Sequence, residues 1–373
     1  MNIGTLTFQY NYNYGAVLQC LALQRAVKSM GVETSVLDFY PPVVQKPWWR
    51  GWGVTDGKFW EKAPRRGITL RHGPAMRKKF DAFRKNELEM SARCVEADVA
   101  KVANEYDAVV VGSDQIWNHA KSPAYFLEWE PAYSGRRISY AACFGQPTQP
   151  SDKIESYGKW LKRFDALSVR DEVSRDVVHN LSGRDADIVA DPTLLVDLED
   201  VAEDPGVPYK DYILTYVLGS EIEGGLKPLM NLLKSKLGDI PVVAVVPSVM
   251  TPNFSGWADQ KLWNASPGQW ISLVKNARFV CTDSFHCALF SMKYHRHLMA
   301  HYSVEERSHR LIDIAKRYGV SKHIVSRIAD VENNELWNQP PDYTQVDQRI
   351  ASHVQESLQY LHTSLKMIKK TNL

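Results

Sequence analysis

The chain has 373 residues, of which 44% are hydrophobic and 24% are charged, and its formal net charge is +2. These values are ordinary for a soluble globular protein with room for two domains, and they do not favour nucleic acid as the partner. The five cysteines are scattered and form no C-x-x-C pair, so we expect buried thiols in a reducing compartment. We find no secretory leader and no apolar run of bilayer length, and therefore expect a cytoplasmic protein.

The first half of the chain alternates strand and helix signals. The helix signal spans 15–30, where Leu18, Ala22 and Ala26 recur at every fourth position on one apolar face. The uninterrupted apolar run 108–111 is typical of a strand buried on both faces of a parallel sheet. The predicted strands are 3–8, 34–39, 106–111, 138–142, 166–169 and 187–189. This alternation predicts a doubly wound sheet that binds ligands at the carboxyl ends of its strands.

A second α/β unit follows a predicted linker. Residues 196–210 are acidic and contain Pro205, Gly206 and Pro208, a composition typical of a domain boundary. After this boundary we predict strands and helices at 212–217, 226–237, 242–246, 270–275 and 279–281. We expect domains at 1–200 and 208–345. An amphipathic helix within 346–373 is expected to pack back across the junction between them.

An unusual insertion lies at about 43–90. It contains Trp48, Trp49, Trp52 and, between positions 58 and 85, ten Lys or Arg residues against two acidic ones. One interpretation is a surface insertion with a solvated basic helix from about Pro74. The other is a surface for an anionic partner, such as a lipid pyrophosphate or the membrane interface.

The segment 278–292 is the most informative about chemistry. It predicts a buried strand, a polar turn and a helix that Asp283 or Ser284 would cap. His286 then falls in the first helical turn, where backbone N–H groups and the helix dipole favour an anion. Its imidazole could bind a negative substrate and move a proton. The alternative is an ordinary capped helix with a half-buried histidine.

Two other polar turns follow predicted strands. In the first, Asn13 suits an N-cap, Gly15 permits close approach of a ligand, and Tyr14 lies between them. A plain strand-to-helix turn explains that segment nearly as well. The second turn groups the polar side chains of Ser113, Asp114 and Asn118 with the ring of Trp117, a combination that is common in sugar sites. Its alternative is a capped helix with Trp117 in the core.

Three further residues are candidates for charge or anion recognition. Arg170 follows a strand and could clamp a carboxylate or phosphate, or pair with a neighbouring acid. Asp191 precedes a proline and could be catalytic or only form an Asx turn. Arg310 begins an amphipathic helix. Its side chain could reach a cleft that contains His286, or it could only cap the surface of its own helix. His295, His297, His301 and His309 lack ligand spacing for a metal, so we predict none.

These segments together resemble the polysaccharide pyruvyl transferase family. The resemblance rests on the order and spacing of the segments 13–19, 111–118, 139–142, 168–171, 191–193 and 282–286. It implies two Rossmann-like domains in a GT-B-like arrangement with the active site between them. It also implies phosphoenolpyruvate as donor and a hexose of a lipid-linked or polymeric glycan as acceptor, often galactose, glucose or N-acetylmannosamine. The product would be a cyclic pyruvate ketal.

The resemblance assigns roles to particular residues as hypotheses. His286 contacts phosphate and acts as acid or base, Asp283 orients it, and Arg170 holds the donor. Asp114 is a catalytic candidate that belongs to the cleft on the acceptor side, together with the substrate-binding residues Trp117 and Asn118. The remaining substrate-binding candidates are Asn13, Tyr14, Gly15, Ser113, Asp191, Ser284 and Arg310.

One position departs from the family pattern. Ser284 stands where some members have arginine, so Arg170, the helix N-terminus or Arg310 must replace that cation. No step requires a metal, cofactor or nucleotide. Two rival functions remain open: a GT-B glycosyltransferase that uses a nucleotide sugar, and a non-catalytic glycan- or anion-binding protein.

Overall fold

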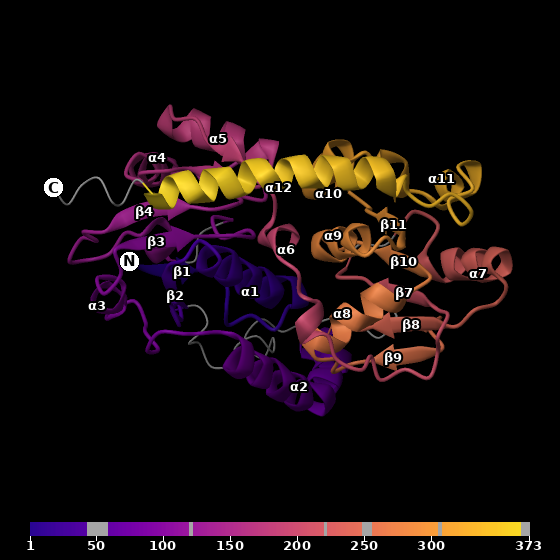
Figure 1. Ribbon diagram of the computed structural model, residues 1–373. Coiled ribbons are helices and arrows are strands. Elements are labelled where there is room, and N and C mark those ends of the chain that lie inside the picture. The colour runs from indigo at the N-terminus through magenta and orange to yellow at the C-terminus, as the bar shows by residue number, and fades with distance from the viewer. Residues whose placement is uncertain (43–58, 119–121, 220–221, 248–255, 305–307, 367–373) are drawn as a thin grey trace.

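The structure, a computed structural model, describes residues 1–42, 59–118, 122–219, 222–247, 256–304 and 308–366. It consists of two α/β halves, each built around a parallel sheet, that lie side by side (Figure 1). Trp48, Trp49 and Trp52 fall outside the described residues. Within those ranges, no helix is both long and apolar enough to cross a membrane.

The first half contains a four-stranded parallel sheet in the order β2-β1-β3-β4. Its strands are β1 (Asn2–Leu6), β2 (Glu33–Val36), β3 (Ala108–Val111) and β4 (Arg136–Ser139). A short parallel pair, β5 (Ser168–Val169) and β6 (Asp187–Ile188), adjoins β4 through a bridge between Ile138 and Ala166. The helices of this half are α1 (Tyr14–Lys28), α3 (Val99–Ala103), α4 (Ile154–Leu161) and α5 (Glu172–Ser182).

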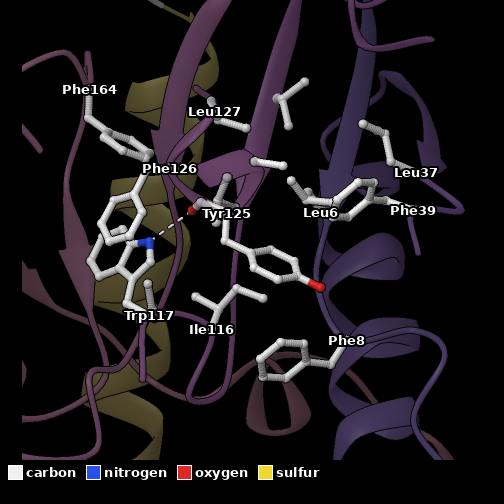
Figure 2. Close-up of a cluster of buried hydrophobic side chains, with 14 of the residues drawn as sticks. Leu6, Phe8, Leu37, Phe39, Ile116, Trp117, Tyr125, Phe126, Leu127 and Phe164 are labelled. Atoms are coloured by element: carbon white, nitrogen blue, oxygen red, sulfur yellow. Dashed lines mark hydrogen bonds between the residues drawn. The ribbon is translucent and has the colours of Figure 1, made fainter. Parts of the chain in front are cut away.

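An aromatic core supports the strand ends of this first sheet. Figure 2 shows Phe8, Phe39 and Tyr125 packed beside β1, with Trp117 and Phe126 on the other side of the cluster. The Trp117 and Phe126 rings stack at a centroid distance of 5.4 Å. Because apolar side chains fill the space under the loops that follow β1 and β3, those loops are held in fixed positions.

The second half contains a six-stranded parallel sheet in the order β12-β11-β10-β7-β8-β9. The strands are β7 (Ile213–Tyr216), β8 (Val242–Val245), β9 (Gln260–Leu262), β10 (Phe279–Thr282), β11 (His297–His301) and β12 (Ile324–Val325). The helices are α7 (Leu226–Leu237), α8 (Pro267–Asn276), α9 (Phe285–Lys293), α10 (His309–Tyr318) and α11 (Ile328–Asn333). Strand β10 lies between β7 and β11, so the residues after it lie near the middle of the sheet edge.

The final helix, α12 (Tyr343–Lys366), contacts both halves, as Figure 1 shows. In the second half, the buried Val346 packs with the apolar side chains of α9 and α10. In the first half, Ser357 Oγ accepts a hydrogen bond from the backbone N–H of Ala190 at 2.8 Å. The hydroxyl of Tyr360 donates to the Ser139 carbonyl at 2.9 Å. The sequence prediction that this helix packs back across the junction is therefore confirmed.

Helix α2 (Phe59–Glu87) differs from the expected solvated helix. It begins well before Pro74, and Met76, Phe80 and Phe83 on its inner face are buried. Phe80 packs on Tyr14 with ring centroids 5.1 Å apart. Lys79 Nζ donates to Gln269 Oε1 of α8 at 2.8 Å. The helix therefore contacts both halves, and among its described side chains the inner face is buried.

Candidate functional site

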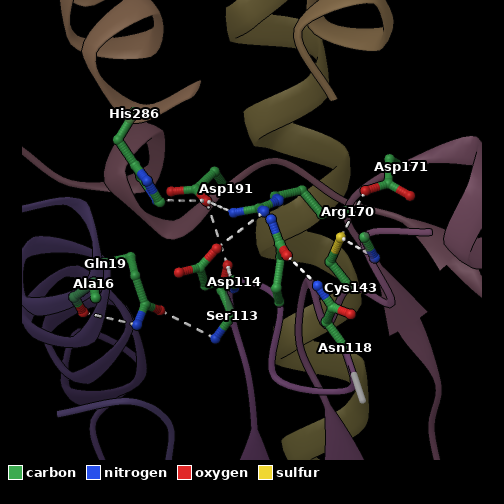
Figure 3. A network of polar contacts seen from close by, with 12 residues as sticks. Ala16, Gln19, Ser113, Asp114, Asn118, Cys143, Arg170, Asp171, Asp191 and His286 are labelled. Atoms are coloured by element: carbon green, nitrogen blue, oxygen red, sulfur yellow. Dashed lines mark hydrogen bonds and ion pairs between the residues drawn. The ribbon is translucent and has the colours of Figure 1, made fainter. Parts of the chain in front are cut away.

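A buried network of charged groups lies where the two halves meet (Figure 3). Its centre is Asp191, in the turn before the short helix α6 (Pro192–Leu195). Asp191 Oδ2 accepts hydrogen bonds from Arg170 Nη1 at 2.9 Å and Ser113 Oγ at 3.3 Å. Its Oδ1 accepts from the backbone N–H and the hydroxyl of Thr193, at 3.1 and 2.8 Å. Burial alone would raise the pKa of Asp191, but His286, Arg170 and Thr193 hold it well below its usual value.

His286 enters this network from the other half. Ser284 caps α9, because its hydroxyl accepts a hydrogen bond from the Cys287 N–H at 3.3 Å. The His286 ring is buried, and its Nε2 lies 3.5 Å from Asp191 Oδ2. Nε2 makes no hydrogen bond within the described part of the protein. The geometry is therefore a close, buried approach between the imidazole of one half and the Asp191 carboxylate of the other.

The β1–α1 turn accommodates the His286 ring. A Cβ atom on Gly15 would lie 2.2 Å from His286 Nδ1, so only glycine permits this contact. Asn13 caps α1 by accepting a hydrogen bond from the Ala16 N–H at 3.2 Å. Tyr14 stacks on Trp270 at a centroid distance of 5.5 Å. Its hydroxyl donates to the Ala265 carbonyl at 3.0 Å. Tyr14 therefore packs between the two halves, in contrast to the substrate contact that we expected from the sequence.

The carboxylate that faces His286 Nε2 is Asp191, not Asp283 as predicted. Asp283 Oδ1 accepts a hydrogen bond from the Leu218 N–H at 2.6 Å, and its Oδ2 accepts from the Gly219 N–H at 2.9 Å. These bonds hold the loop that follows β7. We therefore assign the orienting contact to Asp191.

Arg170 is charge-balanced inside the protein. Its side chain is only 2% exposed, and its second contact joins Nη2 to Asp114 Oδ1 at 3.2 Å. The ring of Phe285 lies 4.1 Å from the guanidinium carbon. Burial would lower the pKa of Arg170, but the surrounding acidic groups raise it above its usual value. Since two carboxylates already neutralise it, the expectation that Arg170 clamps substrate directly gives way to a role in fixing Asp114 and Asp191.

Asp114 is the member of the network nearest to solvent. Its side chain is 17% exposed, whereas that of Asp191 is 1% exposed. Burial would raise the pKa of Asp114, but Arg170, His286 and Arg310 hold it below its usual value. Its neighbour Ser113 is fully buried and donates its backbone N–H to Gln19 Oε1 at 3.1 Å. Asp114 is therefore an anion held at the margin of the network.

A polar cavity of about 490 Å³ adjoins this margin. The loops after β3 and β4 line it from the first half, and the start of α10 lines it from the second. Its lining residues are Gln115, Asn118, Gly145, Gln146, Pro147, Thr148, His309 and Arg310. The Arg310 guanidinium lies 2.7 Å from the Gln115 side-chain amide, an approach that assigns the amide oxygen to that side. Asn118 from the first half and Arg310 from the second half thus line the same cavity.

Trp117 does not line this cavity. Its ring is fully buried in the aromatic core, and its Nε1 donates to the Tyr125 carbonyl at 2.9 Å. Packing of the loop takes precedence because an indole with its N–H satisfied is well suited to a core. The prediction that Trp117 offers a face to a sugar is therefore wrong.

Several residues that support the site were not identified from the sequence. Gln19 links Ser113 to Thr7, Phe285 covers Arg170, and Gln115 meets Arg310. Cys143 Sγ donates to Asp171 Oδ2 at 2.9 Å, and burial raises the pKa of its thiol to about 12. The only signal that could have identified Phe285 and Gln115 is their adjacency in sequence to His286 and Asp114. In the ranges that the structure describes, no cluster of His, Cys, Asp and Glu could hold a metal ion.

Comparisons with known proteins agree with this architecture. A family profile described as polysaccharide pyruvyl transferase matches residues 13–298. Among curated proteins, no sequence matches this chain. The structure of UGT89C1 from Arabidopsis thaliana, complexed with UDP, is similar with a TM-score of 0.52 and 10% identity, over 97% of this chain and 98% of the other. UDP-GlcNAc 2-epimerase from Methanocaldococcus jannaschii gives 0.50 and 11%, over 93% and 98%. At such identities the likeness shows the fold alone, and it confirms the GT-B-like arrangement of two Rossmann-like halves.

Proposed function

Because the chain belongs to the polysaccharide pyruvyl transferase family, we propose that it transfers pyruvate from phosphoenolpyruvate to a hexose. The hexose, which we take to be galactose, glucose or N-acetylmannosamine, would belong to a cell-surface glycan or its lipid-linked precursor. The product is a cyclic ketal. The observation that carries the proposal is the His286–Asp191 contact across the junction, beside a polar cavity that contains Arg310.

The reaction sets clear requirements for proton transfer. A proton adds to the donor methylene, a first sugar hydroxyl bonds to C2, the C2–O bond to phosphate breaks, and a second hydroxyl closes the ketal. The two hydroxyls release two protons, and the methyl carbon and the departing phosphate gain two. A site for this chemistry needs a proton carrier next to a fixed anion, and cations for the donor.

His286 fits the role of proton carrier. It sits in the first turn of α9, where backbone N–H groups and the helix dipole favour a phosphate or carboxylate. Asp191, whose pKa is held well below its usual value, lies 3.5 Å from Nε2. In the proposed reaction, Nε2 delivers a proton to the donor and accepts one from a hydroxyl in a later step.

Arg310 is the better candidate for the donor-binding cation. Arg170 is matched by two carboxylates, whereas Arg310 lines the cavity and lies with its guanidinium carbon 5.9 Å from the Phe285 ring centroid. This position compensates for Ser284, whose hydroxyl is used in capping α9. We infer that the donor phosphate lies between Arg310 and the first turn of α9.

The cavity itself suits an acceptor sugar. The amides of Gln115, Asn118 and Gln146 and the hydroxyl of Thr148 supply donors and acceptors for sugar hydroxyls. Asp114 lies beside the cavity-lining Gln115 in sequence and is the most exposed carboxylate of the buried network. It is therefore our candidate for the base that receives the proton of an attacking hydroxyl.

The test is to incubate the protein with phosphoenolpyruvate and a panel of β-hexosides. We expect release of inorganic phosphate and a ketal methyl signal in the proton NMR spectrum of the product. His286→Ala should abolish both, while His179→Ala, which alters an exposed histidine paired with Asp185, should not. Release of a nucleoside diphosphate from a nucleotide sugar, with phosphoenolpyruvate untouched, would instead establish a glycosyltransferase. Binding without turnover would establish a binding protein.

A lipid-linked acceptor would bring the protein to the inner face of the membrane, and the outer face of α2 supports this extension. Arg71, Lys78 and Lys85 recur at seven-residue spacing on that face and are exposed. Ala75 and Ala82 lie between them and leave the charges accessible. No ion pair neutralises these three basic residues within the part of the chain described. A stripe of this kind favours contact with anionic lipid headgroups.

A further inference from the structure

His301 is a buried histidine without a partner in the protein. It is the last residue of β11 and is fully buried. Neither its Nδ1 nor its Nε2 has a hydrogen-bond partner among the described residues. Burial also lowers the pKa of His301 to about 4, so the ring is neutral and presents one donor and one acceptor. Buried polar groups in native proteins are nearly always paired, so both nitrogens call for an explanation.

The explanation lies in a small cavity at the end of β11. The cavity measures about 30 Å³, and its lining includes His301, Asp283, Ser308 and Arg310. A polar cavity of about 10–15 Å³ is enough for one water molecule. This one therefore has room for one or two waters, but not for a sugar or a phosphate ester. An ordered water needs about two to four polar partners, and the lining of this cavity includes several polar side chains.

Arg310 borders both this small cavity and the large one. The same side chain lines the 490 Å³ cavity, where it meets Gln115. It also lines the small cavity, together with His301 and Asp283. Arg310 thus borders both the proposed substrate site and the space beside the buried histidine, and an occupant of the small cavity lies next to Arg310.

We propose that the small cavity binds an ordered water that links His301 to Arg310, and that His301 is a positioning residue for this arginine. The water accepts a hydrogen bond from the guanidinium and donates to the unprotonated ring nitrogen of His301. Asp283 and Ser308 line the same polar enclosure. The inference rests on the proposed function only in that Arg310 is taken to bind the donor phosphate.

This arrangement explains why a histidine and not a leucine ends β11. An apolar side chain of similar size would fill the strand position, but it would leave Arg310 without its support on that side. Arg310 is the second residue of α10, so its backbone is already fixed by the helix. The water link then holds the long Arg310 side chain in place before the donor binds. Without this link, the side chain would become ordered only on binding, and the lost rotamer freedom would weaken the affinity for the donor.

The test compares His301→Leu, which removes both nitrogens, with His301→Gln, which keeps a donor and an acceptor. We expect His301→Leu to raise KM for phosphoenolpyruvate about tenfold with kcat within about twofold of wild type, and His301→Gln to restore most of the loss. Thermal unfolding should show that both variants are folded. A wild-type KM in His301→Leu, or equal defects in the two variants, would overturn the proposal.

Two further measurements keep this test independent of the reaction. A crystal structure that resolves waters should show one within about 3.2 Å of a His301 ring nitrogen and of Arg310. A dry cavity, or direct contact between the two side chains, would overturn the proposal. Calorimetry with inorganic phosphate should show weaker binding to His301→Leu than to His301→Gln. If that difference holds while phosphoenolpyruvate is not consumed, the proposed function fails and the water link stands.

Discussion

Gly15 and His286 are in contact across the domain junction, and the contact has no room for a side chain at position 15. A Cβ on Gly15 would lie 2.2 Å from Nδ1 and 2.4 Å from Cγ of the imidazole. Gly15 belongs to α1 of the first half, and His286 belongs to α9 of the second. The position of the proposed proton carrier is therefore set by both halves together.

Gly15→Ala should displace the His286 ring and move Nε2 away from Asp191. We expect kcat to fall at least about 100-fold, in line with the loss of a positioned acid or base. The matched control is Gly67→Ala, because an added Cβ at Gly67 meets no atom within 4 Å. Assays of phosphate release should show near-normal activity for the control. Equal activity in both variants would contradict the proposed position of His286.

Arg170 and Arg310 should respond differently to the same substitution. Arg170→Met leaves Asp114 and Asp191 buried without their cation, and breaking such a pair costs about 3–5 kcal/mol. Denaturant unfolding should therefore show a large loss of stability. Arg310→Met should leave stability nearly unchanged and raise KM for phosphoenolpyruvate. If Arg170→Met proved stable and selectively impaired in donor binding, the original assignment of Arg170 as the donor clamp would be restored.

The sequence predicted the fold well where periodicity and turn chemistry agree. The expected helix at 226–237 matches α7, and the strand–turn–helix around Ser284 is present with Ser284 as the cap. Strands β9 and β12 were not predicted. β9 has three residues and β12 has two, too few to show an alternating or continuous apolar pattern.

The residues of the candidate site were predicted from the sequence, but the contacts between them were not. Asp114, Arg170, Asp191 and His286 were all identified, yet the partner of His286 is Asp191 from the other half, not its neighbour Asp283. Contacts between distant segments depend on how the halves dock, and local spacing carries no information about that. Trp117 was misplaced for a related reason, because an aromatic residue after a strand suits a core and a sugar site equally well.

The basic stripe on α2 should determine binding to anionic vesicles. Reversing the charges of Arg71, Lys78 and Lys85 together should reduce cosedimentation with vesicles of phosphatidylglycerol and phosphatidylcholine. Each basic residue near an anionic surface contributes about 1 kcal/mol, so the combined loss should exceed about tenfold. High salt should weaken binding of the unaltered protein in the same way.

The control for the stripe is a second triple reversal elsewhere on the surface. Lys101, Lys162 and Lys227 are exposed and lie on α3, after α4 and on α7. This variant has the same net charge as the stripe variant and should still bind vesicles. Equal loss in both would mean that net charge and not the α2 face governs binding. Activity on a soluble glycoside should be unchanged in either variant.

Lys293 should give the stability of the protein a distinct pH dependence. Its Nζ donates to the carbonyls of Thr193, at 2.8 Å, and Val196, and so ties α9 to the segment that carries Asp191. Burial lowers the pKa of Lys293 to about 8, against the opposing effect of Asp197, Glu199 and Asp191, whereas a lysine in the unfolded chain has its ordinary pKa of 10.5. Between these values the unfolded state binds more protons than the folded state, so this residue makes stability rise with pH, by up to about 1.4 kcal/mol per unit.

Lys293→Met removes the titration of this lysine. The difference in the free energy of unfolding between the two proteins therefore isolates the contribution of Lys293 from that of the many tyrosines that titrate at higher pH. Denaturant unfolding at pH 7.5, 8.5 and 9.5 should show the free energy of unfolding of the unaltered protein rising relative to that of Lys293→Met. Lys275→Met is the control, since Lys275 is a partly exposed residue paired with Glu199. A difference that is flat over this range would mean that the ammonium group of Lys293 is well solvated. It would then act only as a hydrogen-bond donor to the carbonyls of Thr193 and Val196.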